Sequence, residues 1–336
     1  MKQAFRKKFF VIVATVTLKH NSMTNIKANY RSSATFRKNA NGKSLFTFTQ
    51  TVIEQLRLMG KERTSETYLS ALRSFMQFRK NNDILLGDID SDTMLMYEAY
   101  LHNRGISRNS SSFYMRILRA LYNRAVERGE TPDRTPFRHV YTGVDKTFKR
   151  AIPMKAVRKI KELELSRQPS LGFARDMFLF SFYTRGMSFV DMAYLKKKDL
   201  TGDILSYRRR KTGQQLFIKW EKCMKEIADR YNNPKSEYIL PIIKEPNGKE
   251  RIQYINALLQ TNRRLKQIAR MTGIEQPLST YTARHSWASA AKAKNIPVSV
   301  ISEGMGHDSE LTTQIYLASL DTAIIDRANS LILKEL

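Results

Sequence analysis

Four side chains near the C-terminal end of the chain are suited to chemistry at a phosphodiester bond. Arg284, His285, His307 and Tyr316 fall within residues 281–316, which read as two helices and a tight Gly-Met-Gly-His turn. A phenol is a poor nucleophile until it loses its proton and the charge developing on phosphorus is neutralised. Fixed arginine and histidine groups around a tyrosine meet both needs, so this stretch predicts attack on phosphorus by Tyr316.

The charge of the chain predicts a polyanionic partner. Its 336 residues include 58 Lys and Arg against 31 Asp and Glu, a formal net charge of +27. Such an excess repels itself unless a polyanion neutralises it, and nucleic acid is the expected partner. A ribosomal or structural basic protein is the alternative, although these are usually shorter. The length and the 42% hydrophobic content allow two domains, each with its own core.

The cysteine content and the N-terminus bear on the compartment. Cys223 is the one cysteine of the sequence, which excludes an intrachain disulfide and a thiolate-rich zinc cluster and is typical of a reducing compartment. No apolar run reaches the roughly 18 residues of a membrane span. A basic stretch precedes the apolar residues 9–18, as in a signal peptide, but no small-x-small cleavage site follows. We therefore expect a cytoplasmic protein.

Patterns along the chain predict two folded domains. Residues 1–43 hold ten Lys or Arg and no acid, and are expected to be a basic tail, either disordered or an arm that contacts phosphates. Apolar residues at helical spacing then predict four helices within 44–138. Residues 139–152 are the expected linker. Residues 153–336 are expected to be mostly helical, with one hairpin over 204–220 that carries Lys211 at or near its tip.

Five residues of the second domain follow one another in an order that resembles the tyrosine recombinase family, also called phage integrases. Arg185 follows an apolar helix, Lys211 lies on the hairpin, Arg284 begins a helix, His307 lies in a Gly-x-Gly-His turn, and Tyr316 comes nine residues later. The likeness is strongest to integrases and invertases of conjugative transposons and phase-variable DNA segments.

The resemblance implies a mainly α fold and a DNA substrate. A helical, SAM-like core-binding domain and a mixed, mostly helical catalytic domain with a small β-sheet would form a clamp around double-stranded DNA. It also implies a homotetramer on two DNA sites, and an accessory DNA-bending factor is a further candidate partner. No metal or other cofactor is implied, and the absence of a Gly-x-x-x-x-Gly-Lys loop agrees with a reaction that does not use ATP.

The same resemblance implies a role for each residue. Tyr316 would be the nucleophile that forms a 3′-phosphotyrosyl bond, and Lys211 would protonate the leaving 5′-oxygen. Arg185 and Arg284 would hold the non-bridging phosphate oxygens, where planar guanidinium groups match the developing charge. His307 would hydrogen-bond to the phosphate.

Two positions depart from the family pattern. Tyr281 stands where the family usually has a histidine, and a phenol with an ordinary pKa of about 10 is a poor base near neutral pH. The base for Tyr316 therefore stays open, with His285 as a substitute if its ring faces the site and as a packed helix residue otherwise. Aligning the acidic residue of the family with Asp191 puts Ser188 at the first arginine position, and we assign Arg185, which lies one turn earlier.

The C-terminal tail, residues 317–336, has two interpretations. Leu320, Ile324, Ala328 and Leu331 share one helical face, which would cap the chain's own domain or, by the resemblance, dock on a neighbouring protomer. The expected function is site-specific DNA recombination, by integration, excision or inversion. The alternatives are relaxation of supercoils by a type IB topoisomerase-like enzyme and a non-catalytic DNA-binding protein on a recombinase scaffold.

Overall fold

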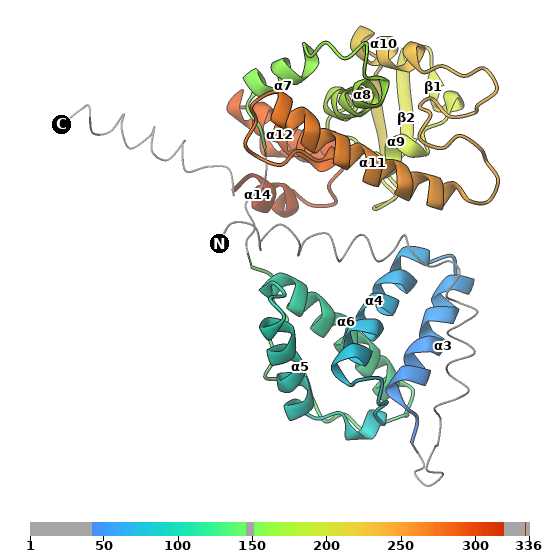
Figure 1. Ribbon diagram of the computed structural model, residues 1–336, viewed down its shortest axis with the longest axis vertical. Helices are drawn as coiled ribbons and strands as arrows, with labels where there is room; N and C mark the ends of the chain where they lie inside the picture. Colours follow the sequence, from blue (N-terminus) through green and yellow to red (C-terminus); the bar gives the residue numbers. More distant parts are fainter. Residues whose placement is uncertain (1–41, 146–150, 319–332, 334–336) are drawn as a thin grey trace. The chain divides into compact units, whose positions relative to one another are not determined.

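The computed structural model describes residues 42–145, 151–318 and 333, and the chain divides into two compact units between Asp145 and Lys146 (Figure 1). The expected basic tail, apart from its last two residues, and the apolar stripe of the C-terminal tail lie outside the described residues. Within the described part, no helix is both long enough and apolar enough to cross a membrane.

In residues 42–145, the described part of the first unit, four helices and one short 3-10 turn surround an aromatic core. Its core centres on Phe48, Phe75, Tyr97, Met115 and Tyr122, all of which are buried. The elements are α3 (Leu45–Leu58), α4 (Glu62–Phe78), η2 (Leu86–Asp88), α5 (Ser91–Asn103) and α6 (Arg108–Glu127).

Local side-chain bonds explain where these helices begin. Asp90 caps α5 by accepting a hydrogen bond from the Thr93 amide at 2.8 Å, which is the usual role of an aspartate at this position. Helix α4 begins at Glu62, three residues before Ser65. The Ser65 hydroxyl donates to the Glu62 carbonyl at 2.7 Å and so lies inside the first turn instead of capping it.

The segment after α6 packs against the first unit. Phe137 and Val140 are buried in its core. Asn109 binds the backbone of Asp145 twice, accepting from its amide at 2.8 Å and donating to its carbonyl at 3.0 Å. Residues 139–145 of the expected linker therefore lie against the helical unit.

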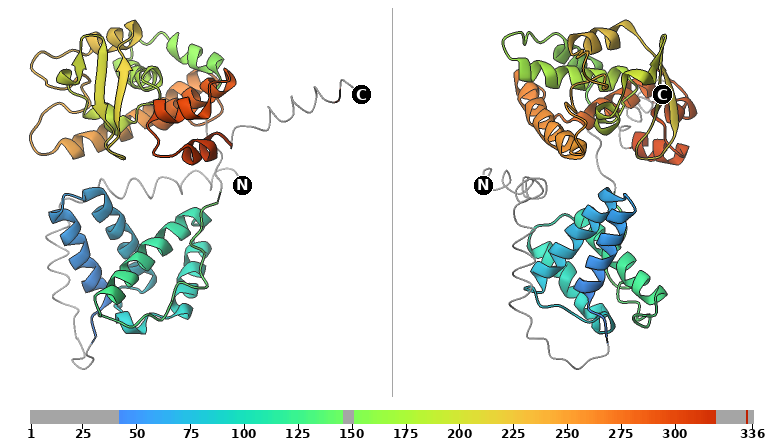
Figure 2. Two further views of the ribbon diagram at one scale, coloured as in Figure 1. Left: turned by 180° about the vertical axis from the view of Figure 1, so that it is seen from behind. Right: turned by 90° about the vertical axis from the view of Figure 1, so that its right-hand side faces the viewer.

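The second unit is built around one buried helix, α8. Figures 1 and 2 show it with α11 and α12 on one side and the strands on the other. Buried residues lie on every face of α8, as expected for a central helix. It begins at Pro169, in keeping with the preference for proline at the first helical position. The helices are α7 (Met154–Lys161), α8 (Pro169–Tyr183), α9 (Phe189–Ala193), α10 (Lys222–Arg230), α11 (Glu250–Met271), α12 (Thr280–Ala293), α13 (Val298–Met305) and α14 (Glu310–Ala318).

A small antiparallel sheet carries the expected hairpin. Strands β2 (Ile204–Arg208) and β3 (Gln215–Lys219) pair with Leu205 opposite Ile218. A two-residue strand, β1 (Leu200–Thr201), follows the turn η3 (Lys197–Asp199) and completes the order β1-β2-β3. Leu205 and Tyr207 face the core while Phe217 on the other face is 62% exposed, as the two-residue period of a strand requires. The mainly α class with a small sheet is confirmed.

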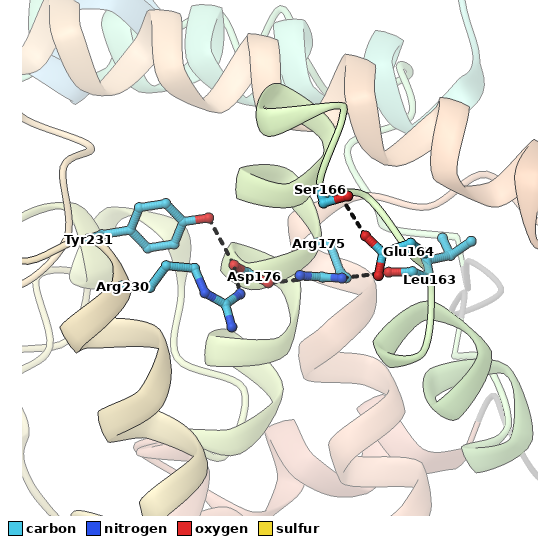
Figure 3. Close-up of polar contacts among 7 residues, drawn as sticks. All are labelled: Leu163, Glu164, Ser166, Arg175, Asp176, Arg230 and Tyr231. Atoms are coloured by element: carbon cyan, nitrogen blue, oxygen red, sulfur yellow. Dashed lines mark hydrogen bonds and ion pairs between the residues drawn. The ribbon is translucent and has the colours of Figure 1, made fainter.

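A buried ion network joins α8 to α10 (Figure 3). The Asp176 carboxylate, 2% exposed, accepts from Arg175 Nε at 2.9 Å, Arg230 Nη1 at 2.5 Å and the Tyr231 hydroxyl at 2.8 Å. Arg175 also donates to the Leu163 carbonyl at 2.6 Å, which secures the segment before α8. The carboxylate is buried, so its three donors replace the water it has lost.

We expect Asp176→Asn to destabilise the second unit by about 3 kcal/mol, because removing one partner of a buried ion pair leaves the other charges uncompensated. The measurement is the free energy of unfolding in urea. The control is Asp203→Asn, which removes the charge of an exposed aspartate before β2. Equal effects of the two substitutions would contradict this role for Asp176.

Candidate active site

Arg284 joins three segments of the second unit that are distant in sequence. It lies in the first turns of α12, whose start is fixed by a capping box between Ser279 and Thr282. Its side chain is 2% exposed. Nη1 donates to the Gly186 carbonyl at 2.8 Å, and Nη2 donates to the Met305 carbonyl at 2.8 Å. The guanidinium thus connects α12 to the turn after α8 and to the end of α13.

The backbone of the turn after α8 allows Arg284 to pack directly against it. Gly186 has φ +77°, and a Cβ on it would lie 2.8 Å from both Cα and Cγ of Arg284. Only glycine leaves room for that approach. Arg185, the residue before it, also has a positive φ of 59°, which is strained for a residue with a side chain. Its Cδ lies 3.7 Å from where a Cβ on Gly304 would be, so its side chain reaches α13.

His307 follows the left-handed cap of α13. Gly306 has φ 65°, and the His307 amide donates back to the Ser302 carbonyl at 3.0 Å, a common way to end a helix. The imidazole then bridges two helices. Nε2 lies 2.9 Å from Nη2 of Arg284, and Nδ1 lies 2.7 Å from the Thr313 hydroxyl on α14.

Burial, together with the positive charges of Arg284, Arg209 and Lys211, lowers the pKa of His307 to about 4. The ring is therefore neutral near pH 7. That Lys211 contributes shows that its ammonium lies within electrostatic range of the imidazole, although Lys211 itself is exposed.

Lys211 is carried by a hairpin turn that is fixed at its base. The Asp191 carboxylate accepts from the Arg210 backbone amide at 2.9 Å and from the Ser188 hydroxyl at 2.6 Å. The Arg210 guanidinium stacks 3.8 Å from the ring centre of Tyr194. Ser188, the other alignment for the first arginine, is the N-cap of α9. Arg210, the residue before Lys211, therefore anchors the hairpin turn to α9.

Arg209 is a site residue that the sequence reasoning missed. It is 6% exposed and donates from Nη1 to the Gly306 carbonyl. A Cβ on Gly306 would lie 2.7 Å from Arg209 Cδ, so the two are in close contact. The signal was present in the alternation of β2, because Leu205, Tyr207 and Arg209 occupy successive inward positions.

The charges of three arginines act on the buried Tyr207. Burial raises the pKa of its phenol, as does Asp191, while the charges of Arg209, Arg284 and Arg185 lower it. These three guanidinium groups, from the hairpin, α12 and the turn after α8, therefore lie within electrostatic range of one phenol. Their combined positive charge, together with Lys211, suits an anionic ligand such as a phosphodiester.

The remaining predicted residues are placed as follows. Tyr281 is 48% exposed on the first turn of α12, and its ring meets the edge of His285 with centroids 4.9 Å apart. His285 is 8% exposed and hence buried under Tyr281. Tyr316 lies on α14, three residues after Thr313, a rise of about 4.5 Å along the helix axis. Its backbone is thus one turn from the contact between α14 and His307.

We expect Gly186→Ala to cost about 3 kcal/mol of unfolding free energy, from a strained positive φ and a clash with the α12 backbone. The matched control is Gly273→Ala, which has φ +67° but no atom within 4 Å of the added Cβ. It should show the backbone cost alone, about 1 kcal/mol. Urea unfolding measures both, and equal costs would contradict the close approach of Arg284.

The lowered pKa of His307 predicts a pH-dependent stability. In the unfolded chain the imidazole titrates near its ordinary value of 6.5, and in the folded protein near 4. Between these values the unfolded state binds more protons, so the stability that His307 contributes is complete above pH 6.5 and is lost as the pH falls toward 4. Urea unfolding should therefore show that the free energy of unfolding falls more between pH 7 and pH 5 in the wild type than in His307→Gln. A loss of equal size would refute the assignment.

Comparisons with known proteins bear on both units. The model of the phage integrase SAM-like domain matches residues 44–140, and the model of the phage integrase family matches residues 185–323. Tyrosine recombinase XerD of Listeria monocytogenes is 24% identical over 268 residues, covering 75% of this chain and 86% of the relative. Tyrosine recombinase XerA of Thermococcus kodakarensis is 23% identical over 235 residues, covering 68% and 78%.

Solved structures share the fold. A lambda integrase tetramer bound to a Holliday junction superposes with a TM-score of 0.64 at 16% identity, covering 89% of this chain and 86% of that one. XerH site-specific recombinase bound to a palindromic difH substrate gives 0.59 at 16% identity, covering 85% and 84%. The resemblance seen in the order of Arg185, Lys211, Arg284, His307 and Tyr316 is confirmed at the level of the family. Because the two family models together match most of the chain, the protein belongs to the phage integrase family of tyrosine recombinases.

Proposed function

We propose that this protein is a site-specific recombinase that cuts and rejoins duplex DNA through Tyr316. The observation that carries the proposal is a continuous set of hydrogen bonds from Gly186 through Arg284 and His307 to Thr313. It ends on α14, the helix that carries Tyr316. The set of bonds therefore connects the proposed phosphate clamp directly to the helix of the nucleophile.

The proposed step is an in-line exchange at phosphorus. The Tyr316 oxygen forms a bond to phosphorus while the bond to the 5′-oxygen breaks, which leaves a 3′-phosphotyrosyl link. Lys211 gives its proton to the leaving 5′-oxygen, a form of acid catalysis worth about 10² to 10⁴ in rate. Arg284 and Arg185 stabilise the charge on the non-bridging oxygens, with His307 beside them. The new ester keeps the energy of the old one, so the reverse step rejoins the strand without ATP.

In the proposed step the Tyr316 proton passes to bulk water, because neither of the two residues considered as its base is suited to accept it. Tyr281 stands where the family usually has a histidine, and its exposure at the start of α12 suits contact with a phosphate. His285 is buried behind the Tyr281 ring, which disfavours it as a base that must reach the nucleophile. We therefore assign Tyr281 to phosphate contact and His285 to packing.

Double-stranded DNA is the proposed partner, supported by the net charge of +27. Residues 44–138 and 153–336 would serve as the core-binding and catalytic domains, joined by 139–152. The lambda integrase structures include DNA-bound dimers and a tetramer on a Holliday junction, which supports a homotetramer on two sites, linked by the C-terminal tail. Such a recombinase of a mobile or invertible DNA element would act in the cytoplasm, at the nucleoid, with or without an accessory DNA-bending factor.

We expect Tyr316→Phe to abolish the covalent protein–DNA adduct while leaving DNA affinity within about twofold of the wild type, because only the attacking oxygen is removed. The measurement is a nicked suicide duplex that traps the adduct, read on a denaturing gel, beside a separate binding titration. Tyr68→Phe on α4 is the matched control and should form adduct at the wild-type rate. An adduct that persists in Tyr316→Phe would assign the nucleophile elsewhere.

The same assay separates recombination from its alternatives. A plasmid with two sites should give inverted or excised product, whereas a type IB topoisomerase-like enzyme would only relax it. A wild-type chain that binds the duplex but never forms adduct would show a DNA-binding protein without catalysis.

A further inference from the structure

The hydrogen bonds around His307 determine which ring nitrogen carries its proton. An arginine side chain can only donate hydrogen bonds. Because Nη2 of Arg284 lies 2.9 Å from Nε2 of His307, that nitrogen must be the acceptor in the neutral ring. The proton is therefore on Nδ1, which donates to the Thr313 hydroxyl at 2.7 Å.

Thr313 is placed to keep that arrangement. It is completely buried on α14, so no water competes for its hydroxyl. Its neighbour Thr312 is exposed and shares its hydroxyl only with Ser309 at 3.1 Å, at the start of the helix. The bond to His307 is thus specific to position 313, one helical turn before Tyr316.

The consequence concerns where His307 can gain a proton. Since Thr313 accepts from Nδ1–H in both the neutral and the protonated ring, any added proton goes to Nε2. Nε2 faces Arg284, and the proposed reaction requires the phosphate to bind at Arg284. A phosphodiester beside Arg284 favours the charged ring, since an opposite charge nearby stabilises it. His307 could then donate from Nε2 to the phosphate while Nδ1 still holds α14.

We propose that Thr313 is a positioning residue that fixes His307 with its Nδ1 proton toward α14, so that proton gain and loss occur only at the nitrogen facing the phosphate clamp. The proposal rests on the proposed recombinase function for its catalytic consequence. Among the residues that the structure describes, the groups that act on the imidazole include Arg284 from α12, Arg209 and Lys211 from the hairpin, and the neutral Thr313 from α14. The named charged groups are all positive, so the approach of an anion is what would change its protonation.

The first test needs no activity and uses a site variant only to assign the His307 signals. Long-range proton–nitrogen correlation spectra of the full chain with isotope-labelled histidine distinguish the two neutral forms of a ring, and His307→Gln identifies the His307 signals among the five histidines. Near pH 7 we expect the proton on Nδ1. A proton on Nε2 in the wild type would overturn the proposal.

The second test compares variants at position 313. Thr313→Val removes the hydroxyl at nearly constant shape and should slow adduct formation about 10- to 100-fold, by analogy with the loss of a group that orients a metal-binding imidazole. Thr313→Ser keeps the hydroxyl and should restore the rate to within about threefold. Thr312→Val is the control on the same helix and should match the wild type. The pH profile of adduct formation should shift in Thr313→Val alone, whereas a purely structural role would lower the rate equally at every pH.

The outcomes separate the two proposals. If the wild type forms adduct and Thr313→Val does so within twofold, with an unchanged pH profile, Thr313 does not position His307. If the wild type forms no adduct at all, the proposed function fails, and the spectra still decide the bond between His307 and Thr313. Should Thr313→Val fail to fold, the rate and profile of Thr313→Ser and the wild-type spectra decide the proposal.

Discussion

The catalytic unit depends on the close approach of Arg284 to the backbone of Gly186. A Cβ at Gly186 would overlap the backbone of α12. Helix α12 can therefore pack against this turn only because residue 186 has no side chain. In this position the Arg284 guanidinium donates hydrogen bonds to two carbonyls, one in the turn after α8 and one at the end of α13. Buried carbonyls and a buried cation each need a partner, and here they satisfy one another. The positions of Arg185 and His307 follow from this contact.

The site concentrates positive charge that the folded protein must tolerate without its substrate. Arg209 and Arg284 are both buried, and within the described part of the chain they donate to the backbone carbonyls of Gly306, Gly186 and Met305, while Arg284 also contacts the His307 ring. A carbonyl accepts a hydrogen bond from a guanidinium group but does not neutralise its positive charge. That charge therefore remains available to attract an anion. The Asp191 carboxylate is used instead on a hydroxyl and a backbone amide of the hairpin.

Sequence periodicity predicted the elements well because each depends on local spacing. The helices around Phe48 and Leu118 and the hairpin with Lys211 follow from periods of 3.6 and two residues. Spacing alone does not fix the start of α4, because the Ser65 hydroxyl could cap a helix or bond within its first turn, as it does here. The order of five residues indicated the family, yet it could not show that Arg284 and Gly186, 98 positions apart, meet.

Contacts between distant segments also explain why Arg209 and Thr313 were missed. Each belongs to a local pattern that has an ordinary interpretation, a basic hairpin turn and a polar helix start. Their importance arises only where the hairpin, α13 and α14 converge on Gly306 and His307. Strand alternation could show that Arg209 points inward, but the sequence of neither segment shows which distant residues it meets.

The tie between Asp191 and the hairpin has an evolutionary consequence. The carboxylate binds the main-chain amide of residue 210 and not its side chain. Every amino acid except proline offers that amide, so residue 210 can drift in charge and size while the hairpin stays anchored beside Lys211. Relatives could therefore diversify the surface of this turn as their target sites diverge, with selection at position 210 acting chiefly against proline.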